Sequence, residues 1–203
     1  MGSIEEIEKY AKNNNIPIMQ KDGIEFLCNY INDNNIRTIL EIGTAIGYSS
    51  IKMAQVSPKI RITTIERDEE RYKEALKNIK RLNLETQIEL IFNDANEIEI
   101  KEKFDLIFID AAKAQNIKFF EKFKNNLNEN GTIITDNLNF HGLTNDIENI
   151  KSKNLKALVR KIINYKNYLE NNQEYSTKFI EIGDGISISK KNNLNLPKIW
   201  YNV

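Results

Sequence analysis

The residues with the sharpest chemical implication in this sequence are Asp110, Asp136 and Asn137. Asp110 ends an apolar run that starts at Phe104, and the pair Asp136-Asn137 directly follows a second apolar run. Two carboxylates and an amide carbonyl are hard oxygen ligands, and they leave the open positions that Mg²⁺ fills with water and substrate oxygens. The chain has one cysteine and one histidine, so no Cys/His cluster argues for zinc. Helix capping combined with a turn explains the same three residues about equally well.

Lys113 lies three residues after Asp110 and would join the same site if the chain turns there. A neighbouring cation would lower the pKa of its ammonium group, which suits a residue that accepts a proton. The alternative is a solvated lysine with no role in chemistry. His141, the single histidine, follows Asp136 closely and could contact a substrate, although a lone histidine in a loop is more often a surface residue.

A second group of residues forms a glycine-containing turn after another apolar run. Glu41 ends that run, Gly43 and Gly47 follow, and a helical pattern begins at Tyr48. A dinucleotide-binding fingerprint would need glycines at Ala45 and Tyr48, and a P-loop would need lysine after Gly47. The turn therefore predicts a ligand that carries adenosine but no pyrophosphate. An ordinary junction between a strand and a helix is the alternative, because turns with two glycines are common.

Polar residues stand at the ends of five successive predicted strands. They are Glu41, Glu66, Asp94, Asp110 and Asp136-Asn137. Because open α/β sheets bind ligands at the carboxyl ends of their strands, we expect these side chains to share one site. Glu66 could accept both hydroxyl groups of a ribose, but a cluster of charges at the start of the next helix would explain it equally well.

Bringing these residues together requires alternating strands and helices, which the apolar periodicity predicts from residue 36 onward. The predicted strands are 37–42, 61–66, 87–92, 104–110 and 132–136, and the predicted helices are 48–55, 68–82, 116–127 and 154–170. Two further helices, 4–13 and 23–33, precede the first strand, and Asp22 is the expected N-cap of the second.

The end of the chain departs from this alternation. Strands predicted at 175–182 and 186–190 are joined by Gly183-Asp184-Gly185, which is typical of a β-hairpin. The sequence therefore predicts an α/β fold with a doubly wound, mostly parallel seven-stranded sheet and a C-terminal antiparallel hairpin.

The composition is that of a globular protein and excludes several classes of function. For 203 residues, 40% of them hydrophobic, we expect one domain over residues 1–203, with N-terminal helices in 1–35 and a core in 36–190. The 29 basic and 29 acidic residues give zero net charge, which excludes a strongly basic nucleic-acid binder but allows a local basic patch. No apolar run approaches the ~20 residues of a membrane span. The lone cysteine, Cys28, fits a reducing compartment, so we expect a cytoplasmic protein without a membrane partner.

One predicted helix carries a basic face. Six basic residues and no acid lie within 151–166, with Lys156, Arg160 and Lys161 at the centre. An apolar stripe is expected to face the core beneath them and consists of Leu155, Leu158, Val159, Ile162 and Ile163. The basic face is either solvated or a surface that contacts phosphates near the mouth of the site, and the sequence leaves both open.

Together these motifs resemble the class I S-adenosylmethionine-dependent methyltransferases, and more closely the catechol-type, metal-dependent O-methyltransferases. The matching segments are Glu41–Ser50, Thr64–Glu66, Asn93–Ala95, Ile109–Lys113 and Thr135–Asn137. The resemblance implies that the cofactors are S-adenosylmethionine and Mg²⁺. It implies a metal site made of Asp110, Asp136 and Asn137, and catalytic roles for Lys113 and Asp110. It also implies a methyl-donor site made of Ile18, Glu41, Gly43, Tyr48, Ser49, Glu66, Asp94, Ala95 and Asp110.

Within that family, the chain is similar to the bacterial enzymes that methylate 5-hydroxyuridine at the wobble position of tRNA to give 5-methoxyuridine. The similar segments are Ile16–Met19, Asp136–Leu138 with His141-Gly142, the helix around Arg160-Lys161, and Gly183–Ser187. The resemblance implies a homodimer that binds the anticodon loop of tRNA, with Lys156, Arg160 and Lys161 as contacts. Methylation of a small catechol or phenol would use the same catalytic residues and is the main alternative, and a non-catalytic nucleotide-binding protein is a lesser one. Asn116 departs from the family, in which an aromatic residue often stands at that position.

Overall fold

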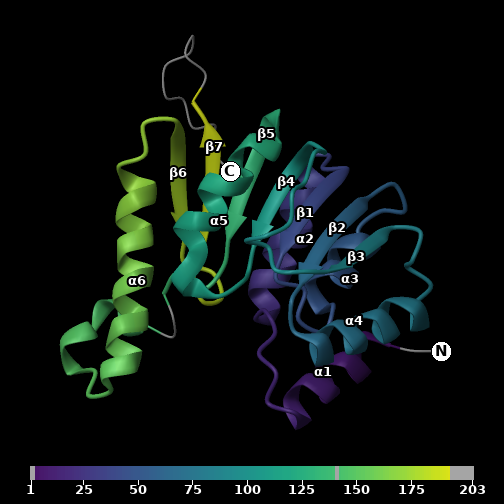
Figure 1. Ribbon diagram of the computed structural model, residues 1–203, viewed down its shortest axis with the longest axis horizontal. Coiled ribbons are helices and arrows are strands. Elements are labelled where there is room, and N and C mark those ends of the chain that lie inside the picture. Colours follow the sequence, from purple (N-terminus) through teal and green to yellow (C-terminus); the bar gives the residue numbers. More distant parts are fainter. Residues whose placement is uncertain (1–2, 140–141, 193–203) are drawn as a thin grey trace.

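Residues 3–139 and 142–192 are described by the computed structural model, in which helices flank a seven-stranded sheet (Figure 1). The strands are β1 (Thr38–Ile42), β2 (Arg61–Glu66), β3 (Ile88–Phe92), β4 (Phe104–Ile109), β5 (Leu127–Thr135), β6 (Tyr175–Ile180) and β7 (Ile186–Lys191). The α-helices are α1 (Ile4–Asn13), α2 (Lys21–Asp33), α3 (Tyr48–Gln55), α4 (Glu69–Arg81), α5 (Asn116–Phe123) and α6 (Lys153–Glu170). Short 3₁₀ turns cover Lys113–Gln115, Lys124–Asn126, Leu143–Asn145 and Ile147–Asn149. Within this part of the chain, no helix combines the length and the apolar character that crossing a membrane requires.

The strand order β3-β2-β1-β4-β5-β7-β6 is that of a doubly wound sheet whose winding reverses beside β1. Adjacent strands from β3 to β5 are parallel, while β7 runs antiparallel to both β5 and β6. Ile42 pairs with Ile109, so the ends of β1 and β4 lie side by side at the point of reversal, where ligands bind in such sheets. The predicted fold is confirmed, including the antiparallel hairpin at its end.

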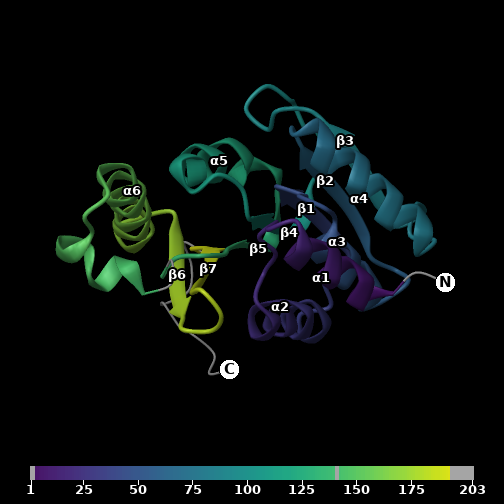
Figure 2. The ribbon, with the colours of Figure 1, turned by 90° about the horizontal axis from the view of Figure 1, so that it is seen from below.

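Helices cover both faces of the sheet, with α1 to α3 on one side and α5 and α6 on the other (Figure 2). Neighbouring residues of one strand therefore enter different cores. Ile39 and Phe108 pack with α1 to α4, whereas Leu40 and Ile107 pack with α5 and α6. Burial on both faces explains the continuous apolar runs of the sequence. The buried stripe of α6 differs from the predicted one and consists of Val159, Ile162, Tyr165 and Leu169, while Leu155, Leu158 and Ile163 are half-buried.

The largest difference from the predicted elements lies between α5 and β5. Helix α5 ends at Phe123, a 3₁₀ turn follows, and β5 already begins at Leu127. The prediction of a helix to residue 127 and a strand from residue 132 is therefore wrong. The side chain of Asn126 holds the chain in this turn, because it donates a hydrogen bond of 2.7 Å to the carbonyl oxygen of Ile100 in a distant loop.

The predicted N-cap of α2 is also wrong. The helix begins at Lys21, with Gln20 in the N-cap position. Asp22 lies in the first turn, where its carboxylate accepts hydrogen bonds from the backbone amides of Gly23 (2.9 Å) and Gly183 (3.1 Å). Asp22 therefore ties the start of α2 to the turn between β6 and β7.

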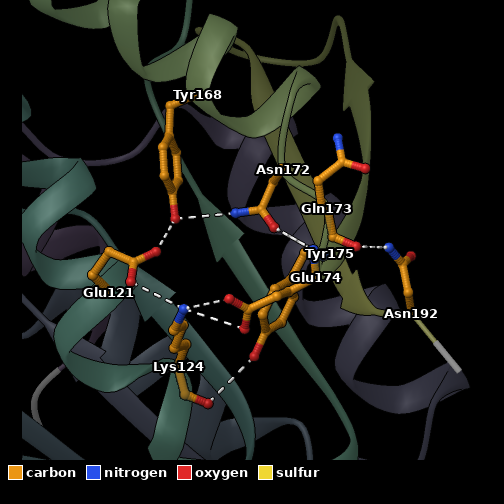
Figure 3. A network of polar contacts seen from close by, with 8 residues as sticks. All are labelled: Glu121, Lys124, Tyr168, Asn172, Gln173, Glu174, Tyr175 and Asn192. Carbon is orange, nitrogen blue, oxygen red and sulfur yellow. Dashed lines mark hydrogen bonds and ion pairs between the residues drawn. The ribbon is translucent and has the colours of Figure 1, made fainter. Parts of the chain in front are cut away.

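A polar network fastens α5 to the corner between α6 and β6 (Figure 3). The ammonium group of Lys124 lies between the carboxylates of Glu121 and Glu174, 3.0 Å from an oxygen of each. Tyr168 of α6 donates a hydrogen bond to Glu121 and accepts one of 3.1 Å from Asn172. These residues lie beside the starts of β5 and β6. The network therefore attaches α6 to the sheet at the edge where the strands begin, away from the polar residues at the carboxyl ends.

Candidate active site

A cavity of about 650 Å³ lies at the carboxyl ends of the parallel strands. Its walls come from the segment before α2, from the turns after β1 to β5, and from α4, α5 and α6. Most of the predicted site residues are in these walls, namely Ile18, Gly43, Glu66, Asp94, Ala95, Asp110, Lys113 and Asn137. The fold thus brings together residues that are more than a hundred positions apart in the sequence.

The turn after β1, here called the glycine turn (Gly43–Gly47), lies against the end of β4. Gly43 has a φ of +99°, and a Cβ atom there would lie 2.5 Å from the backbone carbonyl oxygen of Asp110. Only glycine permits both this conformation and this contact. Gly47 then occupies the N-cap position of α3 in the left-handed conformation. The glycine turn and the loop that begins at Asp110 are therefore in direct contact.

Glu41 lies behind the glycine turn and is completely buried. Its carboxylate accepts hydrogen bonds from the hydroxyl groups of Ser49, Ser50 and Thr64. Burial raises the pKa of Glu41 to about 7, although the three hydroxyl groups oppose the shift. Glu41 and Ser49 therefore brace the turn from behind.

Tyr48 also lies behind the cavity wall. Its side chain is buried, and its hydroxyl group donates a hydrogen bond of 3.0 Å to Glu8 of α1. The side chains of Glu41, Tyr48 and Ser49 are not among the residues that line the cavity. Their predicted contacts with the methyl donor stay predictions, and their hydrogen bonds join β1, β2, α3 and α1 behind the glycine turn.

Glu66 ends β2 at the cavity wall. Its carboxylate accepts hydrogen bonds from the backbone amides of Ala45 (2.8 Å), Arg67 (2.9 Å) and Asp68 (2.8 Å). A carboxylate has about four lone-pair positions, so the bonds fix Glu66 in place and still leave capacity for a ligand hydroxyl group.

Asp94 follows β3 and joins three loops around the same cavity. It pairs with Arg67 at 3.3 Å and accepts hydrogen bonds of 2.8 Å from both the backbone and the side-chain amide of Asn96. The hydrogen bonds from Asn96, reinforced by Arg67, lower the pKa of Asp94. Asn96 also donates to Gln115 at 2.7 Å, so the loops after β2, β3 and β4 are linked.

Asp110, Lys113, Asp136 and Asn137 meet where the ends of β4 and β5 adjoin. The chain turns after Asp110, and the ammonium group of Lys113 lies 2.8 Å from Asp110 Oδ1. Asp136 is only 3% exposed and accepts a hydrogen bond from the Asn137 side chain. Burial, and then the charge of Asp110, raise the pKa of Asp136 to about 7 despite the nearby ammonium of Lys113. Asn137 adopts a left-handed φ of +67°, which asparagine tolerates better than most residues.

This group fits a divalent cation. Two carboxylates lie close enough for one to raise the pKa of the other, and a bound cation would relieve their repulsion. Across residues 3–139 and 142–192, no three or more His, Cys, Asp or Glu side chains are grouped to hold a metal. The residues that could hold a cation here are two carboxylates and one amide oxygen, a set that would suit Mg²⁺ better than zinc.

The sequence did not predict several residues of the cavity wall, which are Arg67, Arg71, Gln115, Phe119 and Leu158. Arg67 directly follows Glu66 at the end of β2, which is a usable signal, whereas Arg71 lies in the first turn of α4. The position of Leu158 depends on how α6 docks against the sheet, which no local pattern encodes.

Helix α6 gives the cavity an apolar residue and carries a basic face beside it. Leu158 lines the cavity, whereas Arg160 and Lys161 are exposed. Lys156 is half-buried and pairs with Glu148 at 3.0 Å. The basic face predicted from the sequence is therefore made of Arg160 and Lys161 more than of Lys156.

Two other residues singled out in the sequence have no established part in the site. Asn116 is 2% exposed at the start of α5, and neither atom of its amide has a hydrogen-bond partner within the described residues. His141 lies outside the described residues, so its predicted substrate contact stays untested.

Comparisons with known proteins agree with this geometry. The model of a family described as O-methyltransferase matches residues 2–192. A Staphylococcus aureus protein described as a "putative caffeoyl-CoA O-methyltransferase" has a crystal structure with a TM-score of 0.90 and 39% identity, over 95% of this chain and 93% of that one. An O-methyltransferase from Bacillus cereus in complex with S-adenosylhomocysteine has a TM-score of 0.78 and 28% identity, over 93% of this chain and 90% of that one. A catechol O-methyltransferase from Niastella koreensis is 38% identical over 110 residues, which are 50% of this chain and 49% of that one.

The chain belongs to the O-methyltransferase family. Its sheet, with the strand order given above and an antiparallel β7, is the Rossmann-like sheet of these enzymes. The protein is an S-adenosylmethionine-dependent O-methyltransferase.

Proposed function

We propose that this enzyme transfers the methyl group of S-adenosylmethionine to the 5-hydroxyl group of 5-hydroxyuridine at the wobble position of tRNA, with Mg²⁺ as its metal. The observation that carries the proposal is a single cavity that joins the glycine turn to Asp110, Lys113 and Asn137. Its wall includes Leu158 of α6, the helix that exposes Arg160 and Lys161. A donor site, oxygen ligands for a metal and a basic surface are what methylation of an acidic hydroxyl group on RNA requires.

In this proposal, the methyl donor occupies the part of the cavity beside the glycine turn. Glu66 would accept the ribose hydroxyl groups, and Asp94 and Ala95 would border the adenine. Gly43 would let the backbone approach the methionine end, while Ile18 packs nearby. The hydrogen-bonded loops around Asp94 hold these groups in place before the donor arrives, which lowers the entropic cost of binding.

The reaction itself would take place beside Lys113. Asp110, Asp136 and Asn137 would hold Mg²⁺, whose chemistry when bound is to make an acceptor hydroxyl group more acidic. Lys113 lies 2.8 Å from Asp110, and in its neutral amine form it would accept the proton of that hydroxyl group. The acceptor oxygen then attacks the methyl carbon in line with the departing sulfur, which leaves as the thioether of S-adenosylhomocysteine. Holding oxygen and methyl at near-attack distance supplies much of the rate.

The tRNA acceptor fits this geometry in two respects. A wobble uridine is already unpaired in the anticodon loop, so turning it into the cavity costs little. Lys161 lies three positions after Leu158 on α6 and so shares its side of the helix, and phosphates beside that base would come within reach of its charge. We further expect a cytoplasmic homodimer from the family resemblance, which size-exclusion chromatography with light scattering would test for the oligomer.

A small catechol or phenol is the second candidate acceptor. In its favour, the similar protein from Niastella koreensis is named a catechol O-methyltransferase. The same catalytic residues would serve both acceptors, so only the acceptor itself and the need for the basic face of α6 distinguish them. A nucleotide-binding protein without catalysis would differ from both, because Asp110→Ala would then change no activity.

Mass spectrometry of tRNA nucleosides tests the proposal directly. Total tRNA from cells that lack this gene is incubated with the purified protein, S-adenosylmethionine and Mg²⁺, and with mixtures that omit one component. We expect conversion of 5-hydroxyuridine to 5-methoxyuridine only in the complete mixture, with Asp110→Ala as the inactive control. If the protein methylates a catechol but converts none of the tRNA, the proposed tRNA acceptor is wrong and the small molecule is the acceptor.

A further inference from the structure

The turn between β6 and β7, here called the hairpin turn (Ile182–Gly185), lies between the start of α2 and the loop after β5. We propose that Asp22 and the hairpin turn are positioning elements that hold Asp136 and Asn137 in place. We propose further that they couple this pair to the cavity wall formed by Pro17–Met19. The inference rests on the metal role given to Asp136 and Asn137 in the proposed function, and it adds residues to which neither the family match nor the sequence motifs assign a part in the site.

The first contact joins α2 to the hairpin turn across 161 positions of sequence. Asp22 Oδ2 accepts a hydrogen bond of 3.1 Å from the amide of Gly183, and Oδ1 accepts one of 2.9 Å from Gly23. A Cβ atom on Gly183 would lie 3.4 Å from the Cα atom of Gly23, so the two backbones are already in close approach. One carboxylate therefore clamps two glycine-containing segments against each other.

The second contact joins the hairpin turn to the loop after β5. The carbonyl oxygens of Asp184 and Gly185 accept hydrogen bonds from the amides of Asn139 (2.7 Å) and Leu138 (2.9 Å). These amides directly follow Asn137, whose left-handed backbone needs support of this kind. Gly185 has a φ of +84°, and a Cβ atom there would lie 2.7 Å from Asn139 Cγ. The turn and the loop thus fit together with no room for a side chain between them.

The third contact leads to the cavity. Pro17, Ile18 and Met19 line it just before α2 begins. The side chain of Met19 packs on Gly23, where a Cβ atom would lie 3.2 Å from Met19 Cε. A ligand that orders this segment therefore orders the start of α2, the hairpin turn and the loop that carries Asn137. By linkage, a donor analogue should strengthen metal binding, and the metal should strengthen binding of the analogue by the same factor.

Asp22→Ala breaks the first contact at little risk to the fold, because Asp22 is exposed at the surface. Asp33→Ala, at the exposed far end of the same helix, is the matched control. The rates of amide hydrogen exchange at Leu138 and Asn139, measured by NMR on the metal-free full chain, show how firmly the hairpin turn holds this loop. We expect exchange about three- to tenfold faster in Asp22→Ala and unchanged exchange in Asp33→Ala. Equal exchange in Asp22→Ala and the native chain would overturn the inference.

The coupling between metal binding and donor binding is measured as the affinity for Mn²⁺ with and without S-adenosylhomocysteine, by electron paramagnetic resonance. In the native chain we expect the analogue to tighten Mn²⁺ binding. In Asp22→Ala we expect Mn²⁺ affinity about three- to tenfold lower and a smaller effect of the analogue, with a melting temperature within about 3 °C of the native value. Gly185→Ala should weaken Mn²⁺ binding more strongly, because the new Cβ atom would displace Asn139.

Three results separate failure of the inference from failure of the proposed function. Native Mn²⁺ affinity and native coupling in Asp22→Ala would overturn the inference while leaving the metal site intact. A loss of affinity that simply follows a large drop in melting temperature would also overturn it, since the contact would then be structural. Faster exchange in Asp22→Ala with no Mn²⁺ binding by the native chain would support the positioning contact and overturn the metal role.

Discussion

Among single residues, the buried carboxyl groups of Asp136 and Glu41 have strongly raised pKa values. Each has a pKa of about 7, because burial penalises the charged form more than its neighbours favour it. Above neutral pH the metal-free protein therefore contains two charges that the fold disfavours. Functional sites often hold such groups, because a ligand of opposite charge supplies what the protein alone does not.

Asp136→Asn should stabilise the metal-free protein at pH 8 by about 2–4 kcal/mol, because it removes a buried charge while nearly keeping the shape of the side chain. The same substitution removes a proposed metal ligand. The rise in melting temperature that we expect Mg²⁺ to give the native chain should therefore disappear. Thermal and chemical unfolding at pH 8, with and without Mg²⁺, measure both effects.

Asp105→Asn is a control of opposite sign at the other end of β4. Burial tends to raise the pKa of Asp105, but hydrogen bonds from the amides of Arg37 (2.9 Å) and Thr38 (3.0 Å) and from Asn128 (2.7 Å) lower it overall. This replacement should destabilise the protein and leave its response to Mg²⁺ unchanged. If Asp136→Asn also lowered the stability, or still responded to Mg²⁺, the role proposed for Asp136 would be wrong.

Residue types at strand ends predict part of the cavity because topology makes those ends converge. Glu66, Asp94 and Asp110 line the cavity for this reason. Arg71 and Leu158 could not be predicted in the same way, since a residue on a helix faces a cavity only through the packing of that helix. The sequence shows that Glu41 stands at the end of a strand. Its burial behind the turn depends on tertiary packing, which the sequence pattern does not show.

Helix α6 is the element that separates the two candidate acceptors. Replacing Lys156, Arg160 and Lys161 with glutamate should lower kcat/KM for tRNA about tenfold or more and weaken its salt dependence, because contacts with phosphates are lost. Methylation of a small catechol should stay within about twofold, since it needs no phosphate contact. Methyl transfer to both acceptors, measured at two salt concentrations, gives these quantities.

Helix α4 offers a control with the same change of net charge. Lys73, Lys77 and Lys80 lie on α4, which packs on the opposite face of the sheet from α6, and their replacement with glutamate should leave both acceptors nearly unaffected. Equal losses in the two triple variants would point to the overall charge of the protein. Unchanged tRNA methylation in the α6 variant would show that this face does not contact the RNA.

Helices and strands whose ends are marked by residues within or next to the element begin and end where the sequence predicts. Helices α1 (4–13) and α3 (48–55) and strand β2 (61–66) match their predicted ranges, because periodicity and turn residues define their ends. The junction of α5 and β5 is set instead by Asn126, whose partner Ile100 lies in another loop. A contact across such a distance leaves no mark in the local pattern.

The stability of the metal-free molecule as a whole should fall as the pH rises from about 4.5 to 7. The folded protein keeps protons on Glu41 (from 4.5 to about 7) and Asp136 (from 3.8 to about 7) that the unfolded chain has already released. Stability is therefore highest at the acid end of this window and levels off above it. Glu41 alone should account for about 3 kcal/mol.

Chemical unfolding at pH 5 and pH 8 measures this dependence, and a Glu41→Gln/Asp136→Asn double variant should lose most of it. Asp94 and Asp105, whose pKa values are lowered, act in the opposite sense, but below this window. A native stability that rises between pH 5 and pH 7 would contradict the account of both buried carboxylates.

The close contact between Gly43 and the carbonyl oxygen of Asp110 connects the donor side of the cavity, at the glycine turn, with the acceptor side, at the loop after β4. With only 2.5 Å between that oxygen and the place of a Cβ atom, any side chain at position 43 would push the turn and the loop apart. A substitution that adds a side chain at Gly43 should therefore disturb the acceptor side of the cavity as well as the donor side. New acceptors, by contrast, can arise through changes on α6, which meets the cavity at Leu158.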